Sequence, residues 1–352
     1  MRVKKLQKTL EKGVCAIIQN PVNRFYLSGF RSSAGMIVLT DSKAVLFVDF
    51  RYFEKAKKTV HNMDVVLANN FLANAKELLN GEKIKKILLE TDFVNLDSFE
   101  RMKKAFEGIE VSADNSLSQT ISSLRQIKSV EETECIKKSQ GITDNAFTHI
   151  LNFIKEGVTE QEIALELEFF MRKSGSEGVA FDTIAVSGKN SSLPHGVPTD
   201  KPLEKGDFLT MDFGAVFGGY CSDMTRTVAI GFVTDEQQKV YDTVLNAQLK
   251  ALDNIGPNKV CKEIDKIARD LINKEYNGCF GHGLGHSVGL EIHENPALNT
   301  RDKTLLKAGI IMTVEPGIYI PDKFGVRIED MVLITDSSCE NLTKSPKELI
   351  IL

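Results

Sequence analysis

Four carboxylates and one histidine in the second half of the chain place the strongest constraint on its fold. They are Asp212, Asp223, His286, Glu315 and Glu329, and each occurs in a distinctive local sequence. Carboxylates gathered in one pocket repel one another or retain protons unless cations neutralise them. If these five side chains converge, the fold must bring distant segments together around bound metal ions.

The length and composition indicate a globular protein with two domains. A chain of 352 residues is longer than one hydrophobic core usually supports. Its hydrophobic content of 42% and charged content of 26% are ordinary for a globular protein. The net charge of -4 argues against a nucleic-acid partner, and no apolar run is long enough to span a membrane.

The first residues and the cysteines favour a cytoplasmic location. The segment from Met1 to Leu6 lacks the apolar stretch of a signal peptide, and Val3, Leu6 and Leu10 follow helical spacing. The six cysteines are scattered along the chain without a CxxC pair. We therefore expect reduced thiols rather than a disulfide framework.

Strands and helices alternate over the first 125 residues in the pattern of a small α/β domain. Apolar runs bounded by turn residues predict strands at 14–18, 34–39, 44–48 and 84–89. Helical periodicity and end signals predict helices at 52–60, 72–79 and 96–106. This alternation ends near residue 125, which is where we expect the domain to end.

From residue 126 onward, the sequence predicts an α+β domain with a mostly antiparallel sheet. Period-two strands lie between and after long helices, which is typical of that class. Three capping-box patterns predict helix starts at Ser129 with Glu132, Thr159 with Glu162, and Thr234 with Gln237.

Asp212 and Asp223 lie on the two arms of a predicted hairpin. Apolar residues alternate with polar or small ones between 209 and 213, and adjacent glycines supply the turn. A turn centred between Phe217 and Gly218 would bring Asp212 directly opposite Asp223, with Cβ atoms about 4.5–5.5 Å apart. That separation suits two carboxylates sharing a pair of metal ions. Taken alone, two solvent-exposed aspartates would be the more common arrangement.

His282, His286 and His293 form a cluster in a glycine-rich segment. The chain has only six histidines, so this clustering favours a site over three separate core residues. The intervening glycines let the backbone approach a ligand closely. Residues 285–289 also match G-x-S-x-G, but a serine nucleophile needs a later acid and then a later histidine, and His293 leaves no room for that order. Residues 212–214 spell the kinase magnesium motif, but no HRD-type loop precedes them.

Glu315 and Glu329 occur in strand-like segments. Pro316 favours extended backbone at Glu315, which follows an apolar run, so we expect a buried carboxylate at a strand end. Arg327 and Glu329 point to one face of another strand, where a cross-strand ion pair explains them as well as a ligand role does. Only the combined pattern makes both glutamates candidate ligands.

The segments around these five residues resemble those of the pita-bread metallopeptidases, the superfamily of methionine aminopeptidase and aminopeptidase P. Residues 23–30 and 48–52 are similar to the amino-terminal domain of aminopeptidase P, prolidase and creatinase, so the resemblance spans the chain. It implies a creatinase-like α/β domain at 1–125 and a pita-bread catalytic domain with a curved antiparallel sheet at 126–352. Methionine aminopeptidases lack the first domain and creatinase has lost the metal ligands, which leaves the Xaa-Pro peptidase branch.

The resemblance implies a dinuclear-metal exopeptidase that hydrolyses the amino-terminal Xaa-Pro bond of short peptides through a hydroxide between the metals. The metal is expected to be Mn²⁺, with Co²⁺, Zn²⁺ or Fe²⁺ as alternatives. The implied metal ligands are Asp212, Asp223, His286, Glu315 and Glu329, of which Asp223 and Glu329 bridge the ions and Glu315 also moves a proton. The implied catalytic residues are Glu315, His195 near the scissile bond, His282 at the proline pocket, His293 at the carbonyl oxygen, and Arg327, which orients a ligand carboxylate.

Two other functions stay open at this point. One is a prolidase restricted to dipeptides, because the choice depends on loops at the far end of the pocket. The other is an inactive pita-bread binding protein, which the intact set of five residues disfavours. The resemblance also implies a homodimer, in which Phe50 and Arg51 of one subunit would line the entrance to the partner's site.

Overall fold

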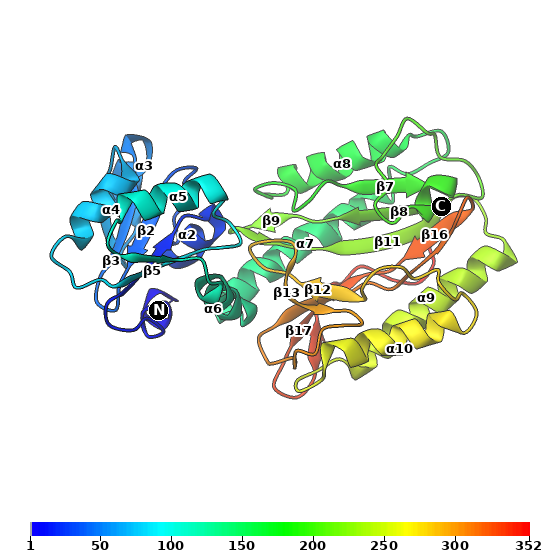
Figure 1. Ribbon diagram of the computed structural model, residues 1–352. Coiled ribbons are helices and arrows are strands. Elements are labelled where there is room, and N and C mark those ends of the chain that lie inside the picture. The colour runs from blue at the N-terminus through cyan, green and yellow to red at the C-terminus, as the bar shows by residue number, and fades with distance from the viewer. Residues whose placement is uncertain (1) are drawn as a thin grey trace. The chain divides into compact units, whose positions relative to one another are not determined.

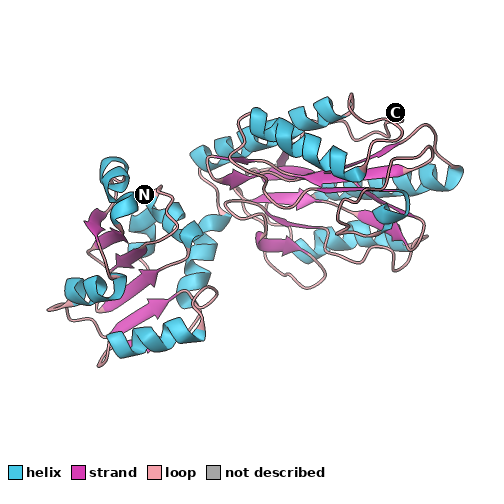
Figure 2. Ribbon diagram, turned by 90° about the horizontal axis from the view of Figure 1, so that it is seen from above, coloured by secondary structure: helices cyan, strands magenta, loops and turns pink. Residues whose placement is uncertain are grey.

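The computed structural model describes residues 2–352 and divides into two compact units, one ending at Arg125 and the other comprising residues 126–352 (Figure 1). Each unit has its own hydrophobic core. In each of them helices flank the strands (Figure 2).

A six-stranded mixed sheet forms the first unit, in the order β4-β3-β2-β1-β5-β6. Its strands are β1 (Val14–Ile18), β2 (Met36–Leu39), β3 (Ala44–Val48), β4 (Asp64–Leu67), β5 (Lys86–Leu89) and β6 (Glu110–Ser112). The helices in this part of the chain are α1 (Arg2–Gln7), α2 (Pro21–Ser28), α3 (Phe50–Thr59), α4 (Phe71–Leu79), α5 (Leu96–Ala105) and α6 (Ser116–Gln126). Strand β1 pairs antiparallel with β2 and parallel with β5, so the α/β pattern predicted for this region is confirmed.

Some elements of the first unit were not predicted. Strand β4 has a single buried residue, Val65, and therefore lacks an apolar run. Helix α3 begins at Phe50, earlier than predicted, because the side chain of Asp49 caps it by accepting a hydrogen bond from the backbone N–H of Arg51.

The second unit contains antiparallel strands in two main sheets. One sheet has the order β11-β8-β7 and the other β13-β12-β14-β17-β18, and the hairpins β9–β10 and β15–β16 complete the set. The strands are β7 (Ile184–Ser187), β8 (Phe208–Phe213), β9 (Val216–Phe217), β10 (Tyr220–Cys221), β11 (Met224–Ala229), β12 (Gly285–Ser287), β13 (Glu294–Leu298), β14 (Ile311–Val314), β15 (Gly317–Ile320), β16 (Phe324–Arg327), β17 (Asp330–Ile334) and β18 (Cys339–Asn341). The expected antiparallel pairing is confirmed.

Long helices cover the strands of this unit on both sides. They are α7 (Val130–Ile150), α8 (Glu160–Lys173), α9 (Asp235–Asn254) and α10 (Cys261–Asn273). One core packs α7 and α8 against β8 and β11, while the other packs α9 and α10 against β14, β16 and β17. In Figure 1, α8 lies along β7 and β8, and α9 and α10 lie beyond the strands on the opposite side. The site residues are therefore carried by strands between two helical layers.

All three predicted capping boxes are present. The side chains of Ser129, Thr159 and Thr234 each accept a hydrogen bond from the backbone N–H three residues later, and the acidic or amide side chain there accepts one from the backbone N–H of the capping residue. Helices α7, α8 and α9 start directly after these residues, because the motif satisfies backbone donors that an uncapped helix leaves unpaired.

The predicted pairing of Asp212 with Asp223 is wrong by two residues. Asp212 lies opposite Thr225, while Asp223 precedes the first residue of β11. The turn is centred between Gly218 and Gly219, whose φ values are 58° and 86°. A two-residue turn with positive φ at both positions matches strand twist, so this glycine pair takes the centre.

The described residues, 2–352, include no helix with the length and apolar character needed to cross a bilayer.

Candidate metal centre

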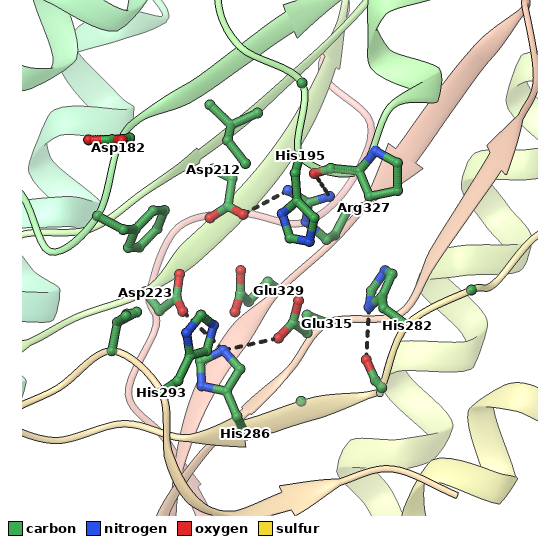
Figure 3. A pocket seen from close by; sticks show the side chains of 18 of the residues that line it. Asp182, His195, Asp212, Asp223, His282, His286, His293, Glu315, Arg327 and Glu329 are labelled. Atoms are coloured by element: carbon green, nitrogen blue, oxygen red, sulfur yellow. Dashed lines mark hydrogen bonds and ion pairs between the residues drawn. The ribbon is translucent and has the colours of Figure 1, made fainter. Parts of the chain in front are cut away.

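A cavity of about 1000 Å³ in the second unit contains every residue predicted to form the site. Its lining includes His195, Asp212, Asp223, His282, His286, His293, Glu315, Arg327 and Glu329 (Figure 3). The structure therefore gathers side chains from segments that are far apart in the sequence.

The five candidate ligands come from the ends and edges of several strands. Asp212 is in β8, Asp223 immediately precedes β11, and His286 is in β12. Glu315 follows β14 directly, as the proline after it led us to expect, and Glu329 lies between β16 and β17. All five side chains are therefore in strands or directly beside strand ends, which suits a site that needs fixed geometry.

The ligand atoms lie close enough to share bound cations. Asp223, His286 and Glu329 each offer one ligand atom, and these atoms lie within 4.8 Å of one another. The Nε2 atom of His286 is 3.6 Å from Oδ2 of Asp223 and 3.3 Å from Oε1 of Glu315. Asp212 lies at the other side of this group in Figure 3.

Two buried oxygens of this group lack a hydrogen-bond donor. Within residues 2–352, Oδ1 of Asp212 and Oε1 of Glu329 have no hydrogen-bond partner. Glu329 is only 1% exposed, so water does not readily solvate it in place of a donor. A buried polar atom without a partner costs about 1–3 kcal/mol, and more when it is charged. These oxygens are therefore suited to bind a cation.

Burial and mutual repulsion change the pKa values of the ligands. Burial raises the pKa of Asp223 and of Glu329 well above the usual range, and the neighbouring carboxylates raise both further. Burial also raises the pKa of Glu315 to about 8. Burial, assisted by the nearby His293, lowers the pKa of His286 to about 4, so its imidazole is neutral, as a metal ligand must be.

Arg327 and Thr225 connect the ligands to one another. Arg327, which is 3% exposed, donates from Nη2 to Oδ2 of Asp212 at 2.7 Å and from Nε to Oγ1 of Thr225 at 3.0 Å. Thr225 donates in turn to Oε2 of Glu329 at 2.7 Å. The ion pair of Arg327, in β16, is therefore with Asp212 in β8. In Asp212 and in Glu329, one carboxylate oxygen therefore accepts a hydrogen bond from the protein, and the other is available to bind a cation.

His282 is held in one tautomer beside the ligand group. Its Nδ1 lies 2.8 Å from the carbonyl oxygen of Gly283 and must carry the proton, so Nε2 accepts from the hydroxyl of Tyr319 at 3.0 Å. Arg327 donates to the same hydroxyl at 2.7 Å. Burial lowers the pKa of His282 to about 4, so this imidazole is neutral near pH 7.

His293 lies against a metal-ligand candidate, and a buried ion pair supports its loop. The rings of His286 and His293 are 4.4 Å apart in an edge-to-face arrangement. Lys128 donates to Oε2 of Glu294 at 3.3 Å and to the hydroxyl of Ser287 at 2.9 Å. Because Ser287 follows His286 and Glu294 follows His293, this lysine links the two histidine segments.

The sequence matches two known families over most of its length. Residues 134–336 match metallopeptidase family M24, and residues 2–127 match the creatinase/prolidase N-terminal domain. The first match covers more than half of the chain and contains every candidate site residue. The chain belongs to metallopeptidase family M24.

Curated relatives match the chain from end to end. The M24 chain is 40% identical over 338 residues to the uncharacterized peptidase YqhT of Bacillus subtilis, covering 96% of this chain and 95% of that protein. It is 38% identical over 356 residues to an Xaa-Pro dipeptidase of Pyrococcus furiosus, covering 99% of each.

Solved structures of two differently named enzymes share its fold. An Xaa-Pro dipeptidase from Bacillus anthracis superposes with a TM-score of 0.96 at 40% identity, covering 100% of this chain and 99% of that one. An X-Pro aminopeptidase from Thermotoga maritima gives 0.92 at 38% identity, covering 99% and 100%. The predicted fold class and the predicted metallo-exopeptidase family are confirmed.

Membership in an M24 metallopeptidase family implies divalent metal ions, and the residues present fit them. The candidate donors are carboxylate oxygens and one neutral imidazole nitrogen, a set that first-row divalent metals accept. The unpaired oxygens of Asp212 and Glu329 point to the same conclusion on grounds of hydrogen bonding alone.

Sequence reasoning did not find the residues that support the ligands. Thr225 lies two positions after Asp223 and so shares its strand face, a signal that the mistaken register concealed. Tyr319 is 37 residues from His282, and nothing local in the sequence links them.

Proposed function

We propose that this protein is a dinuclear-metal exopeptidase that hydrolyses the amino-terminal Xaa-Pro bond of short peptides. The main support for this proposal is that five candidate ligands line one cavity. Two of them have buried oxygens without a hydrogen-bond partner in the described residues. The relatives named Xaa-Pro dipeptidase and X-Pro aminopeptidase support a proline-directed substrate.

Asp212, Asp223, His286, Glu315 and Glu329 would hold the metal ions, and Asp223 and Glu329 would each serve as a ligand of both. The oxygen-rich set favours Mn²⁺, with Co²⁺, Zn²⁺ and Fe²⁺ as alternatives. When bound, such ions lower the pKa of water and polarise a carbonyl group. No serine or cysteine nucleophile is required.

The protein side chains then bind the peptide and move the proton. Glu315, with 15% of its side chain exposed to the cavity, takes a proton from the attacking water and delivers it to the leaving proline nitrogen. His293 donates a hydrogen bond to the carbonyl oxygen as negative charge develops there. His195 lies across the carboxylates from His293 in Figure 3, which supports a peptide held between the two imidazoles.

Peptides of defined sequence test this function. With Mn²⁺ added, the protein should release alanine from Ala-Pro-Ala and leave Ala-Ala-Ala intact. The Glu329→Ala protein is the matched negative control, because it lacks one shared ligand. Equal kcat/KM for Ala-Pro-Ala and Ala-Ala-Ala would refute the proline specificity.

Two observations favour the dipeptidase alternative, of which the first is that similar proteins from Pyrococcus furiosus and Bacillus anthracis are named Xaa-Pro dipeptidase. The second is that Arg301 lines the same cavity and supplies positive charge that attracts the free carboxylate of a dipeptide, whereas the charge of Arg269 is already paired with Asp265. Cleavage of Ala-Pro without cleavage of Ala-Pro-Ala would replace the aminopeptidase proposal with this one.

A homodimer is also part of the proposal, on the strength of the family resemblance. Phe50 and Leu96, 79% and 83% exposed on the first unit, support an interface because large apolar side chains are enriched at the buried centres of such contacts. Sedimentation should give a dimer at micromolar concentration, and a monomer throughout would contradict it.

A further inference from the structure

One buried carboxylate holds both ends of the loop that carries His195. Glu160 is the first residue of α8 and is 0% exposed. Its Oε1 accepts hydrogen bonds from the backbone N–H of Ser187 at 2.6 Å and from the hydroxyl of Ser187 at 2.9 Å. Its Oε2 accepts from the backbone N–H of Thr199 at 3.0 Å and from its hydroxyl at 2.7 Å. Ser187 ends β7, and Thr199 lies on the far side of the loop.

A further side chain inside the loop reaches the same carboxylate. The amide of Asn190 donates to both oxygens of Glu160 at 3.1 Å. Glu160 is therefore saturated with donors, all of which come from the loop or its two ends. Residues 188–198 form a closed loop around this one group.

His195 depends on the loop backbone for its position. Its imidazole makes no hydrogen bond within the part of the chain that the structure describes, and its neighbours Leu193 and Val197 are 57% and 76% exposed. His195 is itself exposed, so packing does not fix this side chain. The carbonyl oxygen of Pro194 accepts from Arg327 at 3.1 Å, which ties the tip of the loop to the group that also holds Asp212.

We propose that Glu160 is a positioning residue for the reaction, because it fixes both ends of the loop and so sets where His195 meets the peptide. The inference rests on the proposed function, in which His195 contacts substrate. Glu160 is not needed to cap α8, since Thr159 and Glu162 form that capping box. Its hydrogen bonds serve the loop and not the helix start.

The substitution Glu160→Gln tests the role at constant volume. The amide has one acceptor oxygen and presents N–H groups to donors at its other end, so one end of the loop is released. We expect kcat/KM for Ala-Pro-Ala to fall about tenfold or more, because small displacements of a positioned group lower rates strongly. Metal content should stay at the wild-type value, since no proposed ligand is touched.

Glu162→Gln is the matched control. It lies in the same helical turn and belongs to the capping box, but within the described residues its side chain forms hydrogen bonds with Thr159 and none with residues 188–198. We expect its kcat/KM to stay within about twofold of wild type and its melting temperature to change less than that of Glu160→Gln, because glutamine also completes a capping box, as Gln237 does with Thr234. A loss of activity in both variants would assign the effect to α8 and overturn the proposal.

A double-mutant cycle with His195→Ala separates positioning from general stability. If Glu160 acts through His195, then Glu160→Gln should change kcat/KM by less than about twofold in the His195→Ala background. Independent multiplication of the two losses would overturn the proposal. Wild-type activity of His195→Ala alone would instead refute the contact of His195 with substrate, which is a failure of the proposed function.

Thr199→Val covers the case in which Glu160→Gln does not fold. It removes the hydroxyl donor to Oε2 and keeps the backbone donor, so it loosens one end of the loop mildly. Thr199→Val is combined with His195→Ala in the same double-mutant cycle. A decrease in kcat/KM that disappears in the His195→Ala background supports the proposal, and a decrease that persists there contradicts it.

Discussion

Two buried glutamates, one in each unit, have the same burial and opposite surroundings. Glu90 in the first unit is 0% exposed, and its Oε2 accepts from the backbone N–H groups of Gln19 and Asn20 at 2.6 and 2.8 Å. Its Oε1 accepts from the amide of Asn23 at 2.7 Å. The protein itself satisfies both oxygens.

Glu329 in the second unit is 1% exposed, and within the described residues its carboxylate accepts one hydrogen bond, from Thr225. Its other oxygen has no partner within residues 2–352, and the carboxylates of Asp212, Asp223 and Glu315 act on its pKa or share its cavity. The difference separates a carboxylate whose hydrogen bonds support the fold from one whose unpaired oxygen is suited to bind a cation, as the proposed function requires. Burial alone does not distinguish them, whereas the supply of donors does.

The largest expected effect is loss of activity on removal of a shared ligand. We predict that Asp223→Ala or Glu329→Ala lowers kcat/KM about a thousandfold or more, because the metal pair loses a common ligand. Neither change should unfold the protein, since each removes a charge that lacks a full set of donors. Activity and bound metal measured on the same preparations check this, and a wild-type rate in either variant would refute the bridging role.

Metal removal should abolish activity by the same logic. Dialysis against a chelator is expected to stop Ala-Pro-Ala cleavage, and Mn²⁺ should restore it. Because the ions bind only the folded site, Mn²⁺ at a hundred times its Kd should stabilise the protein by about 2.7 kcal/mol. Calorimetric unfolding with and without metal measures this. Full activity in protein shown to contain no metal would contradict the proposal that Glu329, unlike Glu90, binds a cation needed for the reaction.

Replacement of Glu90 should give the opposite result. We predict that Glu90→Ala destabilises the protein by about 2 kcal/mol, because it leaves the buried donors of residues 19, 20 and 23 unsatisfied. The folded protein loaded with Mn²⁺ should keep kcat/KM within about twofold of wild type. Denaturant unfolding and peptide assays on one preparation test both halves. A large loss of kcat/KM with normal stability would contradict the interpretation that Glu90 supports the fold and not the reaction.

The smallest expected effect is a pH dependence that only the metal-free protein has. The pKa of Glu315 is raised by burial from 4.5 to about 8. A raised carboxylate pKa stabilises the folded state fully below the unfolded value, and this stabilisation is lost as pH rises through the folded value. The melting temperature of metal-free protein should therefore fall between pH 5 and pH 8, and Glu315→Gln should reduce that fall. An equal fall in both proteins would contradict the assignment to Glu315.

Structural features that depend on a few neighbouring residues could be predicted from the sequence, whereas features that depend on contacts between distant residues could not. The capping boxes at Ser129, Thr159 and Thr234 involve only four residues each, so pattern and structure agree. The hairpin register failed because two adjacent glycines allow more than one turn centre, and only the observed φ values select it.

The same limit applies inside the site. The candidate ligands were found because each carries a recognisable setting and together they resemble a known family. The hydrogen bonds that orient them were not found, since Arg327 reaches Asp212 across 115 residues and Thr225 reaches Glu329 across 104. Glu160 is a further example, because it lies in α8 and its hydrogen-bond donors are at least 27 residues away in the sequence. No local sequence pattern indicates such a contact.

Anomalous X-ray diffraction from crystals soaked in Mn²⁺ tests the central claim most directly. The account predicts two anomalous peaks enclosed by Asp212, Asp223, His286, Glu315 and Glu329, with none beside Glu90. An anomalous map without density among those five side chains, from crystals of protein that cleaves Ala-Pro-Ala, would contradict it.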